Sequence, residues 1–157
     1  IKAIAKAKNK KLHYFICGRG PELDSLKKIA EEERVSNQIH FLGFRSDIKD
    51  LLYASDIFLF TTLQEGMPRS MMEAMACGLP CIASKIRGNT DLLEHGKGGY
   101  LNAVNDIDGF ANSIEILAND SEARKQMKNN NLESIKQYDV NVVKREIFEI
   151  YNIVMGR

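Results

Sequence analysis

The stretch from Asp56 to Ser84, DIFLFTTLQEGMPRSMMEAMACGLPCIAS, decides the fold. Ile57–Phe60 is an apolar run that is too short for a helix and rich in strand formers, as is typical of a buried parallel strand. Pro68 suits the first turn of a helix, and Gly78 suits its end. A second short strand begins at Pro80. The stretch therefore predicts a strand, a loop, a helix and a second strand.

The same alternation of elements continues on both sides of this stretch. The sequence predicts strands at 12–17, 39–42 and from 100, and helices at 1–7, 23–35, 48–54, from 106, and at 140–154. Thr90 is interpreted as a turn or helix start, Ser121 as a helix cap, and Asn129–Asn131 as an interruption of a helix. Alternating strands and helices predict an α/β fold, a Rossmann-like parallel sheet flanked by helices.

Length and composition describe one globular domain. The chain has 157 residues, of which 44% are hydrophobic and 27% charged. A net charge of +1 gives no reason to expect a nucleic-acid partner. No apolar run approaches the roughly 18 residues of a membrane span. The three cysteines, Cys17, Cys77 and Cys81, form no CxxC pair and are interpreted as small buried residues in a reducing cytosol.

The loop-to-helix junction of the central stretch carries the candidate site. In an open parallel sheet, ligands bind outside the carboxyl ends of the strands. Free N–H groups near Met67, Arg69 and Ser70 suit an anion such as a phosphate. Glu65 faces this point from the loop, and Glu73 points back toward it from the helix. Amides for a phosphate and carboxylates for hydroxyls predict a sugar-nucleotide site. For isolated glutamates, a helix cap and a solvated surface charge would be the simpler interpretation.

The spacing around these glutamates resembles a family signature. Glu65-Gly66, six further residues, and then Glu73-Ala-Met-Ala-Cys-Gly-Leu-Pro resemble the retaining glycosyltransferases of group 1, which include glycogen synthases. The resemblance implies that residues 1–157 are the C-terminal, donor-binding half of a two-domain GT-B fold. It implies that Glu73 binds the ribose, that Glu65 contacts the donor sugar as the candidate catalytic residue, and that amides near Arg69 and Ser70 hold the diphosphate.

Three further loops follow predicted strands. Gly18-Arg19-Gly20-Pro21 resembles the family's glycine turn, with Arg19 where an acidic residue is usual. Gly43-Phe44-Arg45 corresponds to a loop that borders the base. Arg87-Gly88-Asn89-Thr90-Asp91 is similar to a Gly-Gly-x-Pro-Glu loop, in a variant associated with capsule and exopolysaccharide enzymes. The full predicted donor site is Gly18, Gly43, Phe44, Arg45, Glu65, Gly66, Met67, Arg69, Ser70 and Glu73.

The resemblance also implies a strand before the first helix, in the centre of the sheet, that ends in an Arg and a Lys for the diphosphate. This chain starts after that strand, so we expect a distorted or swapped sheet, or a longer chain. The implied partners are a nucleoside-diphosphate sugar, with a UDP-sugar favoured, and an N-terminal acceptor domain. No metal or other cofactor is implied. The implied enzyme is cytoplasmic, with peripheral contact at the inner membrane face left open, and the domain alone is expected to be inactive.

Two alternatives of other kinds remain open. A nucleotide-sugar epimerase of similar build would need catalytic acids and a histidine that the sequence does not reveal. A non-catalytic α/β binding module explains the fold, but not the spacing of Glu65, Gly66 and Glu73. A dinucleotide-binding domain needs Gly-x-Gly-x-x-Gly after its first strand, and Gly18-Arg-Gly-Pro-Glu-Leu lacks the third glycine.

Overall fold

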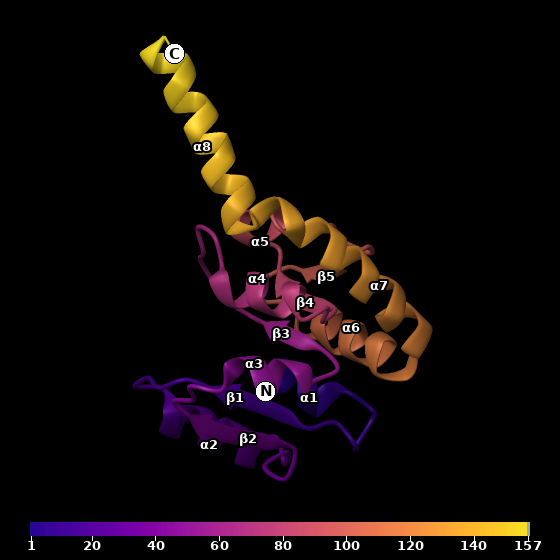
Figure 1. Ribbon diagram of the computed structural model, residues 1–157. Helices are drawn as coiled ribbons and strands as arrows, with labels where there is room; N and C mark the ends of the chain where they lie inside the picture. Colours follow the sequence, from indigo (N-terminus) through magenta and orange to yellow (C-terminus); the bar gives the residue numbers. More distant parts are fainter. Residues whose placement is uncertain (157) are drawn as a thin grey trace.

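The computed structural model describes residues 1–156 and contains two parallel sheets flanked by helices (Figure 1). The first sheet pairs β1 (Tyr14–Cys17) with β2 (Ile39–Gly43). The second has the order β3 (Phe58–Phe60), β4 (Cys81–Ser84), β5 (Gly99–Asn102). The helices are α1 (Lys2–Lys6), α2 (Leu23–Glu32), α3 (Ile48–Tyr53), α4 (Arg69–Ala76), α5 (Arg87–Thr90), α6 (Ile107–Asn119), α7 (Ser121–Ser134), the 3-10 helix η1 (Ile135–Tyr138) and α8 (Val140–Met155).

The sheet is interrupted between β1 and β3. All three strand pairings are parallel, which confirms the predicted fold class. Within residues 1–156, β1 pairs with β2 alone and β3 with β4 alone, so no strand joins the two sheets. The expected distortion of the sheet therefore takes the form of a sheet in two parts.

Side-chain packing joins the two sheets where hydrogen bonds do not. One buried cluster includes Ile4 of α1, Ile39 of β2, Ile82 of β4, and Phe110 and Leu117 of α6. Helix α1 packs directly on α6. Fully burying an apolar side chain of this size contributes about 1.5–3 kcal/mol. The core that α1 and α6 build is therefore what keeps the first sheet attached to the second.

A second buried cluster supports the central stretch. It includes Met71, Ala74 and Met75 on one face of α4, together with Cys81 and Ala83 of β4. Residues at these spacings lie on one side of a helix, so the opposite side of α4 is left to solvent. The predicted strand–loop–helix–strand order is confirmed, with the helix running from Arg69 to Ala76.

Several predicted helix boundaries are wrong. Helix α2 ends at Glu32 rather than near Val35, because Arg34 adopts a left-handed φ of 59°. Thr90 ends α5 instead of starting a helix. Ser121 is the first residue of α7, and Asp120 is its cap. The Asp120 carboxylate accepts a hydrogen bond from the Ala123 N–H at 2.8 Å, as N-cap aspartates do.

Asn129–Asn131 do not interrupt a helix. Helix α7 runs through them to Ser134. Asparagine disfavours helix interiors because its side chain competes for backbone partners. Asn131 is buried, and its amide finds such partners outside the helix, at the carbonyls of Leu79 and Gly98. The tertiary contacts of this one side chain therefore override the local preference.

Helix α8 projects away from the rest of the domain (Figure 1). The helix was predicted, and it ends at Gly156 with a left-handed φ of 65°. None of its residues is buried, and the Ile153 and Val154 side chains are 79% and 75% exposed. Among residues 1–156, no helix has the length and apolar character needed to cross a membrane.

The cysteine prediction is wrong for one of the three residues. Cys81 is buried and Cys77 is half-buried, but Cys17 is exposed. The exposed and half-buried residues of β1 alternate, which places Phe15 and Cys17 on its exposed face. An apolar run indicates a strand, and it does not say that both faces of the strand are covered.

We expect a thiol reagent at pH 8 to label Cys17 at least about a hundredfold faster than Cys81. Burial raises the pKa of the Cys81 thiol, and burial also raises the pKa of Cys77, so both hold less thiolate than an exposed cysteine. Mass spectrometry of peptides from timed quenches measures the three rates. In urea the rates should converge. Labelling of Cys81 as fast as that of Cys17 in the folded chain would contradict the packing.

Candidate functional site

The start of α4 offers unpaired backbone donors. Pro68 caps this helix and is buried, and its carbonyl accepts from the Met72 N–H at 3.1 Å. Within residues 1–156, the N–H groups of Met67, Arg69 and Ser70 have no hydrogen-bond acceptor. Three free donors at the positive end of a helix dipole suit an anion. The backbone donors that the prediction requires are therefore free, and their role in anion binding stays a prediction.

Glu65 lies in the loop between β3 and α4. The residue is half-buried, and its Oε1 accepts a hydrogen bond from the Thr62 hydroxyl at 3.3 Å. No side chain caps α4, so the simpler interpretation of Glu65 as a helix cap does not hold. In the part of the chain that the structure describes, Glu65 forms no ion pair. Its carboxylate thus retains acceptor capacity for a ligand.

Glu73 lies on the exposed side of α4. The neighbouring residues Met71, Ala74 and Met75 face the core, which leaves Glu73 in solvent. It forms no ion pair within residues 1–156. This position allows a ligand contact and equally fits a solvated surface charge, so the role of Glu73 stays a prediction.

The first sheet contributes a second group of predicted residues. The Gly18 N–H donates to the Gly43 carbonyl at 2.8 Å, and both glycines have positive φ, 141° and 65°. The Arg19 guanidinium lies 5.6 Å from the centre of the Phe44 ring. Arg45 donates from Nε to Asp47 at 2.8 Å, and this bond lowers the pKa of the Asp47 carboxyl. The loops after β1 and β2 therefore form one joined edge.

The predicted site residues thus fall into two groups. Glu65, Gly66 and Met67 lie in the loop before α4 and Arg69, Ser70 and Glu73 lie on α4, beside the second sheet, whereas Gly18, Gly43, Phe44 and Arg45 lie on or beside the strands of the first sheet. The interruption between β1 and β3 separates the two groups.

Sequence reasoning missed the residues that support Glu65. Thr62 donates to its carboxylate, and Gly88 lies directly against its backbone. Gly88 belongs to a loop that the sequence did single out, but only as a possible ligand contact. A glycine in a polar loop is the only local signal, and it does not reveal which backbone comes close.

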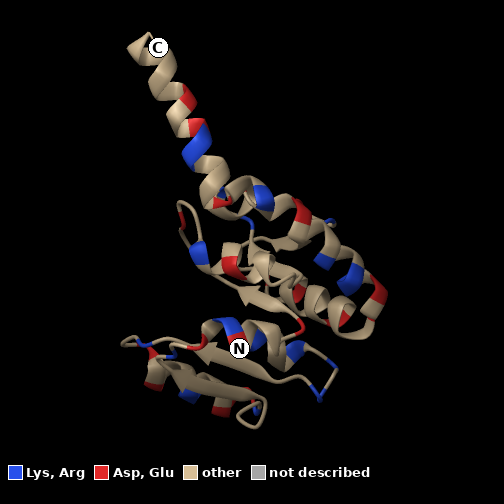
Figure 2. Ribbon diagram, viewed as in Figure 1, with Lys and Arg blue, Asp and Glu red and all other residues tan. Residues whose placement is uncertain are grey.

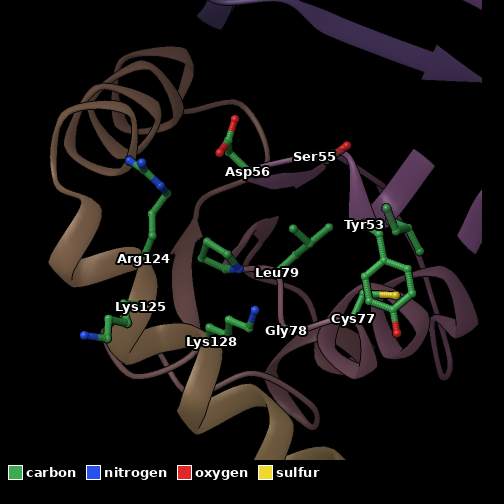
Figure 3. Close-up of a pocket in the computed structure, with 11 residues that line it drawn as sticks. Tyr53, Ser55, Asp56, Cys77, Gly78, Leu79, Arg124, Lys125 and Lys128 are labelled. Atoms are coloured by element: carbon green, nitrogen blue, oxygen red, sulfur yellow. The ribbon is translucent and has the colours of Figure 1, made fainter. Parts of the chain in front are cut away.

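A cavity of about 210 Å³ lies elsewhere, beside the residues that precede β3 and β4 (Figure 3). Asp56, Gly78 and Leu79 line one side, and the basic residues of α7 line the other. Arg124 donates to the carbonyls of Leu117 and Ala118 at the end of α6. This guanidinium already serves a helix C-terminus, as basic side chains often do. The cavity contains none of the predicted donor-site residues.

Lys and Arg occur together with Asp and Glu along most of the ribbon (Figure 2), in keeping with the net charge of +1. Within residues 1–156, no three His, Cys, Asp or Glu side chains are grouped as a metal site requires. The candidate site thus relies on backbone donors and on single carboxylates.

A parallel α/β domain with free amides and two carboxylates at a helix start is of the kind that binds phosphorylated ligands. The sequence profile of the glycosyl transferases group 1 family matches residues 1–134. The chain belongs to the glycosyl transferases of group 1.

The chain resembles curated relatives and solved structures of this type. It is 35% identical over 133 residues to UDP-Gal:alpha-D-GlcNAc-diphosphoundecaprenol alpha-1,3-galactosyltransferase of Escherichia coli, covering 84% of this chain and 34% of that one. It is 32% identical over 121 residues to N-acetyl-alpha-D-glucosaminyl L-malate synthase of Bacillus anthracis, covering 77% and 32%. Anabaena HepE in complex with UDP superposes with a TM-score of 0.88 at 28% identity, covering 96% and 43%. The chain thus spans about a third of the length of these two curated relatives.

Proposed function

We propose that this chain is the donor-binding domain of a retaining glycosyltransferase. The enzyme would transfer a sugar from a nucleoside-diphosphate sugar to a saccharide or lipid-linked acceptor in surface polysaccharide biosynthesis. The observation that carries this proposal is the start of α4, where the free N–H groups of Met67, Arg69 and Ser70 lie between Glu65 and Glu73 in the sequence.

Each part of this junction has a distinct role in the proposal. The free amides hold the diphosphate, Glu73 binds the ribose hydroxyls, and Glu65 contacts the hydroxyls of the donor sugar. The diphosphate gains negative charge as the sugar leaves it. Backbone donors that are already oriented stabilise this charge without reorganising, and the bound sugar is held in position for the acceptor. Glu65 is the proposed catalytic residue because it contacts the sugar that is transferred.

A UDP-sugar is the favoured donor. The name of the Escherichia coli relative includes UDP-Gal, and HepE was solved with UDP, which together support uracil as the base. In the proposal, the base lies against the edge formed by Gly43, Phe44 and Arg45, near Gly18. Phe44 is 69% exposed, so its ring is open to a ligand.

The functions that lie outside this chain are proposed from the longer relatives. Because the match covers only 34% and 32% of these two relatives, we assign the acceptor site to an N-terminal domain and expect the present domain to be inactive alone. The proposed enzyme works in the cytoplasm and needs no metal or other cofactor.

A calorimetric titration with UDP, GDP and ADP tests the proposal. We expect saturable binding of UDP, weakened about tenfold or more by Glu73→Ala, because a hydrogen bond to a charged group is lost. Glu149→Ala on exposed α8 removes a glutamate remote from the site and is the matched control. Equal UDP affinity in wild type and Glu73→Ala would move the ribose contact elsewhere. Failure of all three nucleotides to bind, both to this chain and to a longer form with the preceding strand, would refute the proposal.

A further inference from the structure

Helix α5 lies directly against the loop that carries Glu65. Gly88 is buried, and a Cβ atom on it would lie 2.6 Å from the carbonyl oxygens of both Glu65 and Gly66. It would also lie 2.9 Å from the carbonyl carbon of Glu65. These are backbone atoms, which cannot rotate away as the end of a long side chain can. The backbone of Glu65 and Gly66 therefore occupies its place only because residue 88 has no side chain.

Helix α5 is itself held firmly. Asn89 is fully buried, and its Nδ2 donates to the carbonyl of Ser84, the last residue of β4, at 2.8 Å. Leu92 and Leu93, which follow α5, are buried in the second core cluster. Because the strand and the core fix α5, a Cβ at position 88 would displace the Glu65 loop rather than the helix.

Thr62 contacts the side chain of Glu65, as Gly88 contacts its backbone. The Thr62 hydroxyl lies 3.3 Å from Glu65 Oε1 and 3.2 Å from the Gln64 carbonyl, and it donates toward both acceptors. A carboxylate has two oxygens and several lone pairs, so this contact leaves room for a ligand hydroxyl. Thr62 is half-buried, which limits its freedom to turn away.

Glu73 has a separate support. It lies on α4, whose Met71, Ala74 and Met75 have at most 1% of their surface exposed within the second core cluster. The three atoms nearest to a Cβ at position 88 belong to Glu65 and Gly66, which precede α4, and none of the three belongs to Glu73. The two glutamates can therefore be disturbed one at a time.

We propose that Gly88 and Thr62 are positioning residues that place the Glu65 carboxylate for the donor sugar, independently of the nucleotide contact at Glu73. This inference rests on the proposed function, because it takes Glu65 as the sugar contact. A good hydrogen bond from a sugar hydroxyl to a carboxylate needs an O···O distance of about 2.5–3.0 Å and weakens steeply when its angle falls below about 120°. A displaced loop thus loses sugar recognition, while Glu73 and the amides of Arg69 and Ser70, which belong to α4, still bind the nucleotide.

The experiment compares the affinity for UDP with that for UDP-glucose, UDP-galactose and UDP-N-acetylglucosamine by calorimetry. We expect the wild type to bind one of these UDP-sugars more tightly than UDP. Gly88→Ala and Glu65→Gln should each weaken the affinity for that UDP-sugar about tenfold, and Gly88→Ala should change the affinity for UDP by less than about twofold. Thr62→Val keeps the side-chain shape and the fold, and should weaken the UDP-sugar about threefold. Ser55→Ala removes a comparable exposed hydroxyl bond, to Leu51, and should change neither affinity.

Two results would overturn the inference. One is equal weakening of UDP and the UDP-sugar by Gly88→Ala, and the other is an unchanged sugar preference in both Gly88→Ala and Thr62→Val. A wild type that binds UDP without any preference for a UDP-sugar would overturn the inference and leave the nucleotide site standing.

A wild type that binds no nucleotide would instead count against the proposed function. The packing is then tested by amide chemical shifts in a nitrogen–proton correlation spectrum. Gly88→Ala should shift the amides of Glu65 and Gly66 more than that of Glu73, and the opposite order would overturn the inference.

Discussion

Replacing Gly99 with alanine is expected to lower the free energy of unfolding by more than about 4 kcal/mol at 25 °C. Gly99 is the first residue of β5 and pairs with Cys81 of β4. A Cβ atom on Gly99 would lie 1.8 Å from the Cys81 carbonyl oxygen and 2.7 Å from the Cys81 nitrogen and carbonyl carbon. No side chain can turn aside to make room, because all three are backbone atoms.

The neighbouring strand cannot move away either. Cys81, Ile82, Ala83 and Ser84 are all fully buried, with helices packed against β4. Relieving the contact would mean separating β4 from β5, which are paired along four residues. We therefore expect the free energy of unfolding to fall by more than about 4 kcal/mol, from a total on the order of 5–15 kcal/mol.

Urea unfolding followed by circular dichroism measures this loss. The control is Gly20→Ala, because Gly20 has open space where the Cβ would go and no left-handed φ. The free energy of unfolding of that variant should stay within about 0.5 kcal/mol of the wild-type value. If the free energy of unfolding of Gly99→Ala lies within about 1 kcal/mol of the wild-type value, β4 and β5 are not packed as described.

The sequence predicts elements well where the signal is local. Ile57–Phe60, Pro68 and Gly78 each carry a strand or helix signal within a few residues, and the structure places β3 and α4 there. The spacing of Glu65 and Glu73 likewise singled out the start of α4. The interruption of the sheet was also expected, but only because a family resemblance supplied the strand order.

The contacts that the sequence could not predict join residues far apart in the chain. Gly88 meets Glu65 across 23 positions, as their numbers show, and no periodicity in either segment indicates this approach. The exposed face of α8 is a similar case. Its apolar positions Val143, Ile147 and Ile150 indicate which residues share a side of the helix, and they do not indicate what covers that side.

Asn131→Ala is expected to cost about 3 kcal/mol of stability without weakening UDP binding by the folded chain. The Asn131 Nδ2 donates to the Leu79 carbonyl at 2.7 Å and to the Gly98 carbonyl at 2.8 Å. Leu79 lies just before β4 and Gly98 just before β5, so this side chain ties α7 to the beginnings of two strands. Alanine would leave both carbonyls buried without this donor and would leave a cavity as well.

The matched control lies two residues earlier in the same helix. Asn129 is exposed and forms no side-chain hydrogen bond within residues 1–156. Asn129→Ala therefore deletes the same side-chain atoms as Asn131→Ala, but at a position exposed to solvent. It should be neutral or slightly stabilising, because alanine is the better helix former. Urea unfolding of both variants measures the difference, and UDP titration below the unfolding transition measures binding. Equal stability of the two variants would contradict a stabilising role for the hydrogen bonds from Asn131 to Leu79 and Gly98. A selective loss of UDP affinity in Asn131→Ala would instead show that the beginnings of β4 and β5 are coupled to the start of α4, where the donor site is proposed.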